Sequence, residues 1–425
     1  MADLSKSYII QTKNFIKVVV CDKLGEGGQG AVYKVDYDGK PKALKWYPGK
    51  KFKSPKKFFD NLENNIKKGK PTNAFLWPED ITEYTSGMPF GYIMDLRPSE
   101  YKDFSKFLLG KEVFASITAM VNTALRITVG FNELHRKGYS YQDLNDGNFF
   151  INPQNGSVLI CDNDNVSESG KNSGIAGKAR YMAPEVVLGK AKPDKYTDRF
   201  SLSVVLFLLW TNNHPLEGKA ACPVCMDAKH EKTIYGENPV FVWDPIDNSN
   251  RPVQGLHKGA ILRWPFLPDY VQELFIKAFS KEALGTPSKR IIGPEWLKTF
   301  IRMRSEIYKC PCGEIYFADP VNANPCPTCK KQNKFSMYIK TKKYNIPVHQ
   351  RTKLYACHTE EDSEDFETLT GEVTAKGSDY ELKNVSGKNW MITEGDNTTS
   401  LAPNASVILK KAMKINFGNT SAELI

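Results

Sequence analysis

Three short motifs, spread over about 160 residues, constrain the fold of this chain more than any other feature. They are the glycine-rich segment 25–30 (GEGGQG), the polar segment 141–148 (YQDLNDGN) and the tripeptide Ala-Pro-Glu at 183–185. Each alone is weak evidence, since short segments rich in Gly, Asp or Asn are usually turns. Their order and spacing, however, are typical of the segments that bind ATP and transfer its terminal phosphoryl group. The sequence therefore predicts that they meet in one site.

Composition excludes several other classes of protein. Hydrophobic residues make up 41% of the chain and charged residues 25%, as in an ordinary globular protein. The apolar run 200–210 is far shorter than the roughly 20 residues needed to span a bilayer, and residues 1–10 lack a signal-peptide pattern. We expect a cytoplasmic protein with no membrane partner. The net charge of +10 is modest for this length and the lysine clusters form no basic helix, so we expect no nucleic-acid partner.

The pattern of apolar residues predicts an α+β chain. Strand-like runs lie at 15–20, 31–37, 41–47 and 90–96. Between them, residues 55–68 have helical spacing, with Phe59, Leu62 and Ile66 on one face. Further helical patterns cover 113–134, 198–210, 268–280 and 294–307. After residue 308 the composition changes, and we expect a cysteine-rich segment followed by short strands with no helical stretch.

The glycine-rich segment predicts a phosphate-binding turn. Gly25, Gly27 and Gly30 keep the spacing G-x-G-x-x-G, and with Gly28 they would let backbone N–H groups approach phosphates unobstructed by side chains. Val32, two residues further on, would cover the adenine. A Rossmann site has the same spacing, but a helix follows its glycines, whereas the run that follows here reads as a strand.

Lys45 is the next candidate, in a strand-like run fifteen residues after the last glycine of the motif. A lysine at this place pairs with the α- and β-phosphates of ATP. The alternative is a surface lysine, but Ala43 beside it reads as buried. Glu63, on the helical segment 55–68, is the expected ion-pair partner of Lys45. Its alternative interpretation is a solvated helix carboxylate.

The polar segment predicts the catalytic groups. Asp143 would accept and orient the substrate hydroxyl, and Asn148, five residues later, would hold a magnesium ion. Asp162 ends an apolar run and would be the second magnesium ligand. The local sequence is Asp-Asn-Asp, so Asp164 is an alternative ligand, but the register of the apolar run favours Asp162.

Residues from about 15 to 305 resemble a bacterial serine/threonine protein kinase of the eukaryotic-like superfamily. The resemblance implies a two-lobed fold, ATP with Mg²⁺ or Mn²⁺ as cofactors, and an adenine pocket that includes Ala43, Met94 and Leu96. It also implies that Glu185 of Ala-Pro-Glu pairs with Arg290 and that Asp198 holds the catalytic-loop backbone. These two features are commonly absent from small-molecule kinases of related fold, so they favour a protein substrate.

A narrower resemblance concerns gene context. The Asp-Asn-Asp loop, the stretch 238–245 (NPVFVWDP) and the C-terminal tail resemble a particular kinase type. It accompanies a PP2C-type phosphatase and a von Willebrand factor A protein in tellurite-resistance-associated gene clusters. The resemblance implies these two proteins as partners, besides the protein substrate.

Three positions depart from the kinase pattern. Gln142 replaces the arginine that reads a phosphate on the activation segment, which implies that loop ordering does not need that phosphorylation. Asn145 replaces the lysine that steadies the transferred phosphoryl group, a loss of transition-state stabilisation on the order of a few kcal/mol. Lys178 stands where such kinases usually carry a threonine facing Asp143. We hypothesise that Lys178 supplies the missing charge; the alternative is a solvent-exposed lysine.

The cysteines favour metal binding. Cys310, Cys312, Cys326 and Cys329 form C-x-C-x13-C-x2-C, whose four thiolates would complete a tetrahedral, structural Zn²⁺ site in a zinc ribbon. The pair Cys222 and Cys225 gives only half a site, which His214 and His230 are the nearby candidates to complete. We favour instead an insertion loop with two packing cysteines.

Residues 341–425 alternate like a small β-sandwich whose last half resembles a forkhead-associated domain. The Gly-Arg and Ser-x-x-His elements that read phosphothreonine are missing, so protein docking is the favoured role. The predicted domains are a protein kinase domain at 1–308, with lobes meeting near residue 95, a zinc ribbon at 309–340 and the β-domain at 341–425. The rival hypotheses are a pseudokinase-like nucleotide-binding scaffold and, less favoured, a small-molecule kinase.

Overall fold

The computed structural model describes residues 4–48, 54–171, 177–222, 227–319, 324–333 and 335–425. The chain divides into two compact units. The first comprises Met1–Pro265 and Gln272–Pro294, and the second Phe266–Val271 and Glu295–Ile425. None of the described helices is both long and apolar enough to cross a lipid bilayer.

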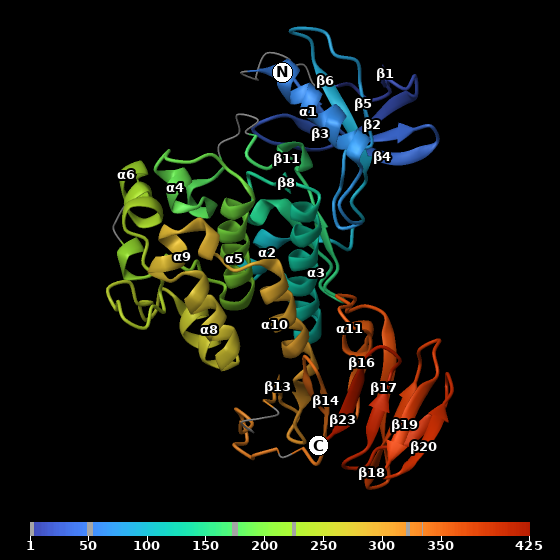
Figure 1. Ribbon diagram of the computed structural model, residues 1–425. Helices are drawn as coiled ribbons and strands as arrows, with labels where there is room; N and C mark the ends of the chain where they lie inside the picture. The colour runs from blue at the N-terminus through green and yellow to red at the C-terminus, as the bar shows by residue number, and fades with distance from the viewer. Residues whose placement is uncertain (1–3, 49–53, 172–176, 223–226, 320–323, 334) are drawn as a thin grey trace. The chain divides into compact units, whose positions relative to one another are not determined.

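The first unit begins with an antiparallel sheet in the order β1-β2-β3-β4-β6-β5 (Figure 1, blue). Its strands are β1 (Ile9–Gln11), β2 (Lys17–Glu26), β3 (Ala31–Tyr37), β4 (Lys40–Tyr47), β5 (Asp80–Ile81) and β6 (Phe90–Asp95). The helix α1 (Pro55–Lys68) covers one face, because Phe58, Phe59 and Leu62 lie along one side of it and pack with Phe90 and Tyr92 of β6. The bounds of this helix confirm the sequence prediction.

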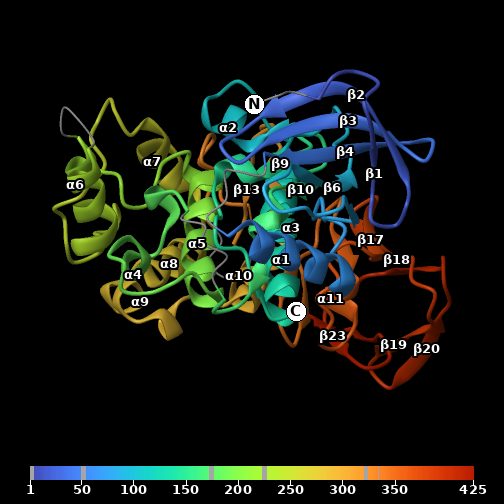
Figure 2. The same cartoon turned by 90° about the horizontal axis from the view of Figure 1, so that it is seen from above.

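Helices form most of the remainder of the first unit (Figures 1 and 2, green to yellow). They are α2 (Phe104–Leu108), α3 (Ile117–Arg136), α4 (Pro184–Val187), α5 (Lys195–Thr211), α6 (Ala228–Lys232), α7 (Lys258–Arg263), α8 (Asp269–Ala278) and α9 (Lys281–Gly285). The first residues of α8 and most of α10 (Gly293–Ser305) belong to the second unit. The centre is α5, buried along nearly its whole length, where Phe207 packs edge-on against Phe241 and Phe275. The sequence placed the start of α3 at residue 113. The helix begins instead at Ile117, because the side chain of Ser116 caps it by accepting a hydrogen bond from the Ala119 N–H.

Short strands between these helices carry the polar motifs. They are β7 (Lys102–Asp103), β8 (Tyr139–Ser140), β9 (Phe149–Ile151), β10 (Val158–Ile160) and β11 (Ser167–Glu168). The hairpin β9–β10 pairs Phe149 with Ile160, so the segments before β9 and after β10 emerge side by side. This register brings the 141–148 motif next to the Asp-Asn-Asp loop.

The second unit is mostly antiparallel sheet (Figure 1, orange to red). A hairpin of β12 (Ile307–Lys309) and β13 (Ile315–Phe317) comes first. Two larger sheets follow, in the orders β15-β14-β23-β22-β19-β20 and β16-β17-β18-β21. Their strands are β14 (Tyr338–Thr341), β15 (Asn345–Pro347), β16 (Lys353–Tyr355), β17 (Leu369–Lys376), β18 (Asp379–Asn384), β19 (Trp390–Glu394), β20 (Asn397–Leu401), β21 (Ser406–Ile408), β22 (Lys414–Asn416) and β23 (Ser421–Leu424).

The two larger sheets face each other. The ring of Trp390 on β19 lies against Gly371 on β17, where a Cβ would come within 3.1 Å of the ring, and Trp390 is 1% exposed. A larger residue at position 371 would therefore require Trp390 or a neighbouring side chain to shift. The expectation of no helical stretch after residue 308 is wrong: α11 (Ala356–Thr359) forms one turn, in which the His358 ring accepts a hydrogen bond from the Tyr355 N–H.

Candidate active site

The glycine-rich segment forms the turn between β2 and β3. Gly27 N–H donates to the Gly30 carbonyl oxygen at 2.8 Å and closes the turn. Gly30 must be glycine because a Cβ there would lie 2.3 Å from the carbonyl oxygen of Trp46 on the neighbouring strand β4. At Gly25 and Gly28, by contrast, a Cβ would meet no atom within 4 Å. The turn thus packs on the sheet at Gly30 and is open around Gly25 and Gly28.

The residues expected around the adenine lie in one apolar cluster. They are Val32 on β3, Ala43 on β4, Met94 on β6 and Leu96 just after β6. These three strands are neighbours in the sheet. Phe150 on β9 and Leu159 on β10 join the cluster. These last two side chains were not among the predicted residues. Each is half-buried while both its neighbours in the strand are buried.

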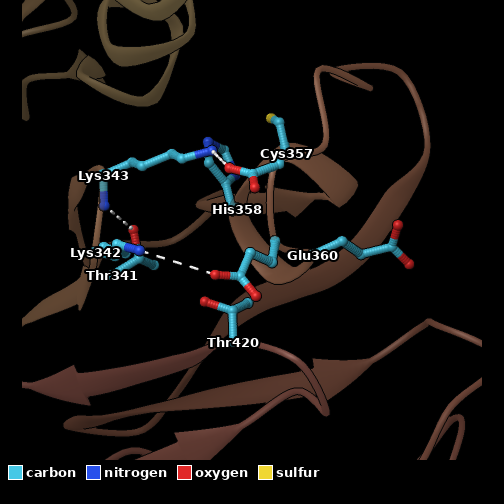
Figure 3. Close-up of a pocket in the computed structure, with 9 residues that line it drawn as sticks. Thr341, Lys342, Lys343, Cys357, His358, Glu360 and Thr420 are labelled. Carbon is cyan, nitrogen blue, oxygen red and sulfur yellow. Dashed lines mark hydrogen bonds and ion pairs between the residues drawn. The ribbon is translucent and has the colours of Figure 1, made fainter.

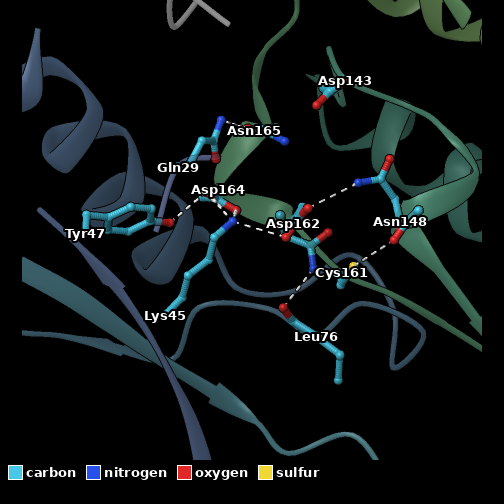
Figure 4. A network of polar contacts seen from close by, with 12 residues as sticks. Gln29, Lys45, Tyr47, Leu76, Asp143, Asn148, Cys161, Asp162, Asp164 and Asn165 are labelled. Atoms are coloured by element: carbon cyan, nitrogen blue, oxygen red, sulfur yellow. Dashed lines mark hydrogen bonds and ion pairs between the residues drawn. The ribbon is translucent and has the colours of Figure 1, made fainter. Parts of the chain in front are cut away.

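Lys45 lies in a buried polar network at the end of this cluster (Figure 4). Its Nζ donates to Asp164 Oδ2 at 2.8 Å and to Asp162 Oδ1 at 3.1 Å. Burial lowers the pKa of Lys45, but Asp164 and then Asp162 raise it, so the net shift is upward. The side chain is therefore a fixed cation.

The expected ion pair between Lys45 and Glu63 does not form. Glu63 Oε1 instead accepts from Lys13 Nζ at 2.5 Å. The core-facing side of α1 is taken by Leu62 and other apolar groups, which leaves Glu63 with a side chain 22% exposed. The acidic partner of Lys45 comes from the Asp-Asn-Asp loop, which the sequence analysis considered only as a source of metal ligands.

The catalytic loop and the Asp-Asn-Asp loop meet at Asn148 and Asp162. Asn148 Nδ2 lies 3.5 Å from Asp162 Oδ2, and the Asn145 N–H donates to Asn148 Oδ1 at 2.8 Å. Asp162 has a left-handed backbone, with φ of 54°, which turns its carboxylate out of the strand toward Asn148. Carboxylate and amide oxygens are the ligands that Mg²⁺ prefers, so this donor set fits a magnesium site.

Asp143 lies beside this pair in a partly desolvated position. An ideal Cβ on Gly177 would be 3.3 Å from Asp143 Oδ1, which shows how closely the activation segment approaches. Burial, followed by the negative charge of Asp162, raises the pKa of Asp143 to about 6, whereas the charge of Lys178 lowers it. A carboxylate with this pKa is a good hydrogen-bond acceptor and still ionised at pH 7.

Lys178 reaches back to the catalytic loop. Its Nζ donates to Asn145 Oδ1 at 3.0 Å, and Asn145 Nδ2 in turn lies 3.3 Å from Asp143 Oδ1. The cation therefore lies over the position from which the usual catalytic-loop lysine is missing. Lys178 is also exposed to solvent, so the contact with Asn145 supports a role for its charge without removing the side chain from water.

Three contacts fix the frame around the loop. Asp198 accepts from the backbone N–H groups of Tyr141 at 2.7 Å and Gln142 at 3.3 Å. Arg290 forms a two-point ion pair with Glu185, at 2.8 and 2.7 Å. The predicted contact of Asp198 with the backbone and the predicted pair of Glu185 with Arg290 are both confirmed. The Gln142 side chain donates to the Lys171 carbonyl oxygen at 2.5 Å, so a neutral hydrogen bond ties the 141–148 motif to the segment at Lys171.

The four cysteines of the predicted ribbon converge in the second unit. Their sulfur atoms all lie within 4.8 Å of one another, with Cys310 to Cys329 at 3.7 Å and Cys312 to Cys326 at 3.6 Å. Four sulfurs held at about 2.3 Å from a central Zn²⁺ would lie roughly 3.8 Å apart. The cluster therefore fits a metal ion with tetrahedral coordination. Among the described residues, these four cysteines are the group with this geometry.

The second cysteine pair gives no such site in the described part of the chain. Cys222 is exposed rather than packed, and Cys225 lies outside the described residues. His214 is buried, with its ring nitrogens bonded to the Arg180 carbonyl oxygen and the Leu216 N–H. His230 is bonded to Asp227 on the surface.

The pocket in Figure 3 lies in the second unit, beside α11. Its charged rim is paired internally: Lys343 Nζ is 3.0 Å from Asp362 Oδ1, and Lys342 Nζ is 3.8 Å from Glu361 Oε1. Burial, with the nearby charge of Arg304, lowers the pKa of His358 in its wall to about 3. The two lysines are thus paired with carboxylates, and His358 is neutral at pH 7. The pocket does not combine a buried cation with neighbouring aspartates, as the site around Lys45 does.

Comparison with known proteins decides the family. A family model described as "Protein kinase domain" matches residues 18–259, more than half of the chain. The chain belongs to the protein kinase family. This kinase is similar to the protein kinase YegI of Escherichia coli, with 21% identity over 234 residues, or 52% of this chain and 34% of the relative. It is also similar to the probable serine/threonine-protein kinase CCRP1 of Zea mays, with 29% identity over 242 residues, or 55% of this chain and 37% of the relative.

A shorter similarity links this kinase to the serine/threonine-protein kinase sck2 of Schizosaccharomyces pombe. It has 27% identity over 145 residues, or 30% of this chain and 22% of the relative. The chain therefore spans well under half the length of the curated relatives it matches.

Proposed function

We propose that this kinase transfers the γ-phosphate of ATP to a serine or threonine hydroxyl of a protein. The observation that carries the proposal is the convergence of Lys45, Asp143, Asn148 and Asp162, from separate segments, on one side of a glycine-rich turn. The family match and the names of the relatives support the same reaction.

Each group has a distinct task in this proposal. The open side of the glycine turn and the apolar cluster bind ATP, and Lys45 orients its α- and β-phosphates. Asn148 and Asp162 hold Mg²⁺ or Mn²⁺, which when bound neutralises charge on the phosphates. Asp143 accepts the proton of the substrate hydroxyl and directs its oxygen at the γ-phosphorus. Lys178 compensates for Asn145 by placing a cation over the transferred group.

The C-terminal half of the first unit supports a protein substrate over a small molecule. The Glu185–Arg290 ion pair fixes the end of the activation segment, on which protein kinases lay the substrate peptide, and Arg290 is only 3% exposed. Breaking a buried pair of this kind is costly. A kinase for small metabolites has no need of this platform.

The second unit is proposed to serve structure and docking. Cys310, Cys312, Cys326 and Cys329 bind a structural Zn²⁺, since four thiolates leave no open position for chemistry. The β-domain of residues 341–425, similar to a forkhead-associated domain, docks other proteins. A PP2C-type phosphatase and a von Willebrand factor A protein are the partners that the narrower resemblance proposes.

The deciding experiment is transfer of label from γ-labelled ATP, with Mg²⁺ or Mn²⁺, to the chain itself and to a generic basic protein. Asp143→Ala protein is the control. Label on serine or threonine that disappears in the control is the expected result. Tight ATP binding without any label would refute the proposal and favour the nucleotide-binding scaffold, for which Asn145 and the Asp-Asn-Asp loop are the supporting departures. Label on a metabolite alone would favour a small-molecule kinase.

A further inference from the structure

Lys45 needs a fixed negative partner because its side chain is only 7% exposed, and an unpaired buried cation is unstable. In the usual arrangement a glutamate from the helix of the N-terminal lobe provides that partner. Here Glu63 of α1 is paired with Lys13 on the helix surface. The partner of Lys45 must therefore come from another element.

Asp164 fills this role completely. Its side chain is 0% exposed, and Lys45 Nζ lies 2.9 Å from its Oδ1 and 2.8 Å from its Oδ2. Tyr47 donates its hydroxyl to Oδ2 at 2.6 Å, and Tyr92 donates to Oδ1 at 3.3 Å. Each carboxylate oxygen thus receives two donors, which leaves no lone pair directed at a metal.

Asp162, two residues earlier, is the opposite case. Its side chain is 45% exposed, and its second oxygen faces Asn148 at 3.5 Å. The sequence left open which of the two aspartates in the loop is the metal ligand, and their contacts differ. Asp162 is available to a metal, and Asp164 is committed to Lys45.

The turn that carries Asp164 is rigidly held. It forms the 3₁₀ turn Asn163–Asn165. The Asn163 side chain, fully buried, donates to the carbonyl oxygens of Leu76 at 2.7 Å and Ile160 at 2.9 Å. Gln29, in the glycine-rich turn, donates to Asn165 Oδ1 at 3.4 Å. Figure 4 shows Gln29, Leu76 and Asn165 around the loop that carries Asp164.

The helix α1 braces the loop instead of supplying the charge. Asn61 and Asn65 both donate their side-chain N–H groups to the Val166 carbonyl oxygen, at 2.8 and 2.9 Å. These neutral bonds attach the helix to the chain immediately after the turn. Glu63 takes no part in these two hydrogen bonds.

We propose that Asp164 is the positioning residue of Lys45 and replaces the helix glutamate of other protein kinases. Metal ligand and lysine partner then sit on one braced turn, so that the phosphate-orienting lysine is preorganised whatever the position of Glu63. This inference rests on the proposed ATP-dependent function. It predicts that movement of α1 does not switch this kinase by making or breaking a Lys45 ion pair.

The test compares Asp164→Asn with Glu63→Gln in the full chain, and Asp60→Asn on the exposed face of α1 serves as the charge-matched control. We expect Asp164→Asn to lower turnover at saturating ATP at least tenfold and to raise the dissociation constant of Mg-ATP at least fivefold. Glu63→Gln should cost less than threefold in either quantity. An equal or larger loss for Glu63→Gln would overturn the proposal, because α1 would then supply the working partner.

A double-mutant cycle shows whether Asp164 acts through the lysine. In a Lys45→Met background, Asp164→Asn should change Mg-ATP affinity less than twofold, since the group it positions is gone. An undiminished effect would mean that Asp164 acts on the metal or the fold, and would overturn the proposal. The cycle uses binding alone, so it decides the question even if the wild-type chain binds ATP and transfers no phosphate, an outcome that refutes only the proposed reaction.

A second variant covers the case in which Asp164→Asn does not fold. Replacing Tyr47 and Tyr92 together by Phe keeps both rings and removes the two hydroxyl groups that hold the carboxylate. We expect a loss of Mg-ATP affinity and turnover in the same direction, at least threefold, with the unfolding midpoint of the nucleotide-free protein recorded alongside. Unchanged affinity and turnover in this double variant would count against the proposal.

Discussion

Asp143 has surroundings that decide the pH range of the reaction. Burial and the negative charge of Asp162 favour its protonated form, and together they raise its pKa to about 6. Only the carboxylate form can accept the proton of the substrate hydroxyl. The free kinase therefore loses its base as the pH falls through about 6 and retains it above pH 7.

We expect kcat/KM to decline on the acid side with a midpoint near pH 6. Bound Mg²⁺ would neutralise part of the charge of Asp162, so raising the Mg²⁺ concentration should move the midpoint downward. Steady-state rates between pH 5 and 9, at two Mg²⁺ concentrations, measure both effects. A midpoint near pH 4 at low Mg²⁺ would show that Asp143 is solvated like an ordinary aspartate.

Lys178 yields a separate prediction. Lys178→Ala should lower kcat by about 10- to 100-fold, the scale of losing one group that stabilises charge in the transition state, with little change in the KM for ATP. Lys178→Arg should restore part of kcat, because it keeps the charge. The exposed Lys190→Ala is the control. An unchanged kcat in Lys178→Ala would exclude the proposed replacement of the catalytic-loop lysine.

At the scale of elements, we expect the segment around the four cysteines to depend on the proposed zinc ion. The hairpin β12–β13 is short, and the buried residues of its cluster are Cys310, Tyr316, Ala318 and Cys326. So small a core cannot offset the entropy of ordering the chain. Zinc-finger-scale metal binding, about 10–16 kcal/mol, can do so.

Cys326→Ser should accordingly reduce bound zinc from one ion per chain to near zero and unfold this segment. Metal analysis and hydrogen exchange over residues 309–340 measure the two effects. Affinity for Mg-ATP should stay within twofold of wild type, since the nucleotide site belongs to the first unit. Cys222→Ser, at an exposed cysteine outside the cluster, should leave the zinc content unchanged. Full zinc content in Cys326→Ser would refute the assigned ligand set.

At the scale of the whole molecule, two units with separate cores should respond to different ligands. Mg-ATP at 100 times its dissociation constant stabilises the unit that binds it by about 2.7 kcal/mol. If the four cysteines hold zinc as proposed, a strong chelator destabilises the second unit. The chain combines both sites, so the two ligands should act on different unfolding transitions.

Differential scanning calorimetry of the full chain should show two transitions. Mg-ATP should raise the midpoint of one, and removal of zinc should lower that of the other. In Lys45→Met protein the shift with ATP should shrink while the response to the chelator persists. A single transition shifted by both treatments would show that the units unfold together.

Local patterns in the sequence were sufficient for the helix over residues 55–68 and the strands around the glycine motif, and the family resemblance implied the pairs Glu185–Arg290 and Asp198 with the catalytic loop. Each depends on periodicity or on a motif whose chemistry requires a particular neighbour. The cysteine spacing likewise predicted a cluster that the structure assembles, because four thiolates in two short knuckles have few other arrangements. Those features were determined by the sequence alone.

Tertiary structure decided which charges pair across the fold. Lys45 is 119 residues from Asp164, and nothing in either segment specifies that the second aspartate of the loop, rather than Glu63, enters the buried space between Tyr47 and Tyr92. The same holds for Lys178 beside Asn145 and for Phe150 and Leu159 beside the apolar cluster of Ala43 and Met94. Such pairings depend on the packing of strands and turns distant in sequence. The sequence determined the chemical groups of this kinase, and the fold determined which of them meet. The physical reason is that a buried charge without a partner of opposite charge destabilises the folded state.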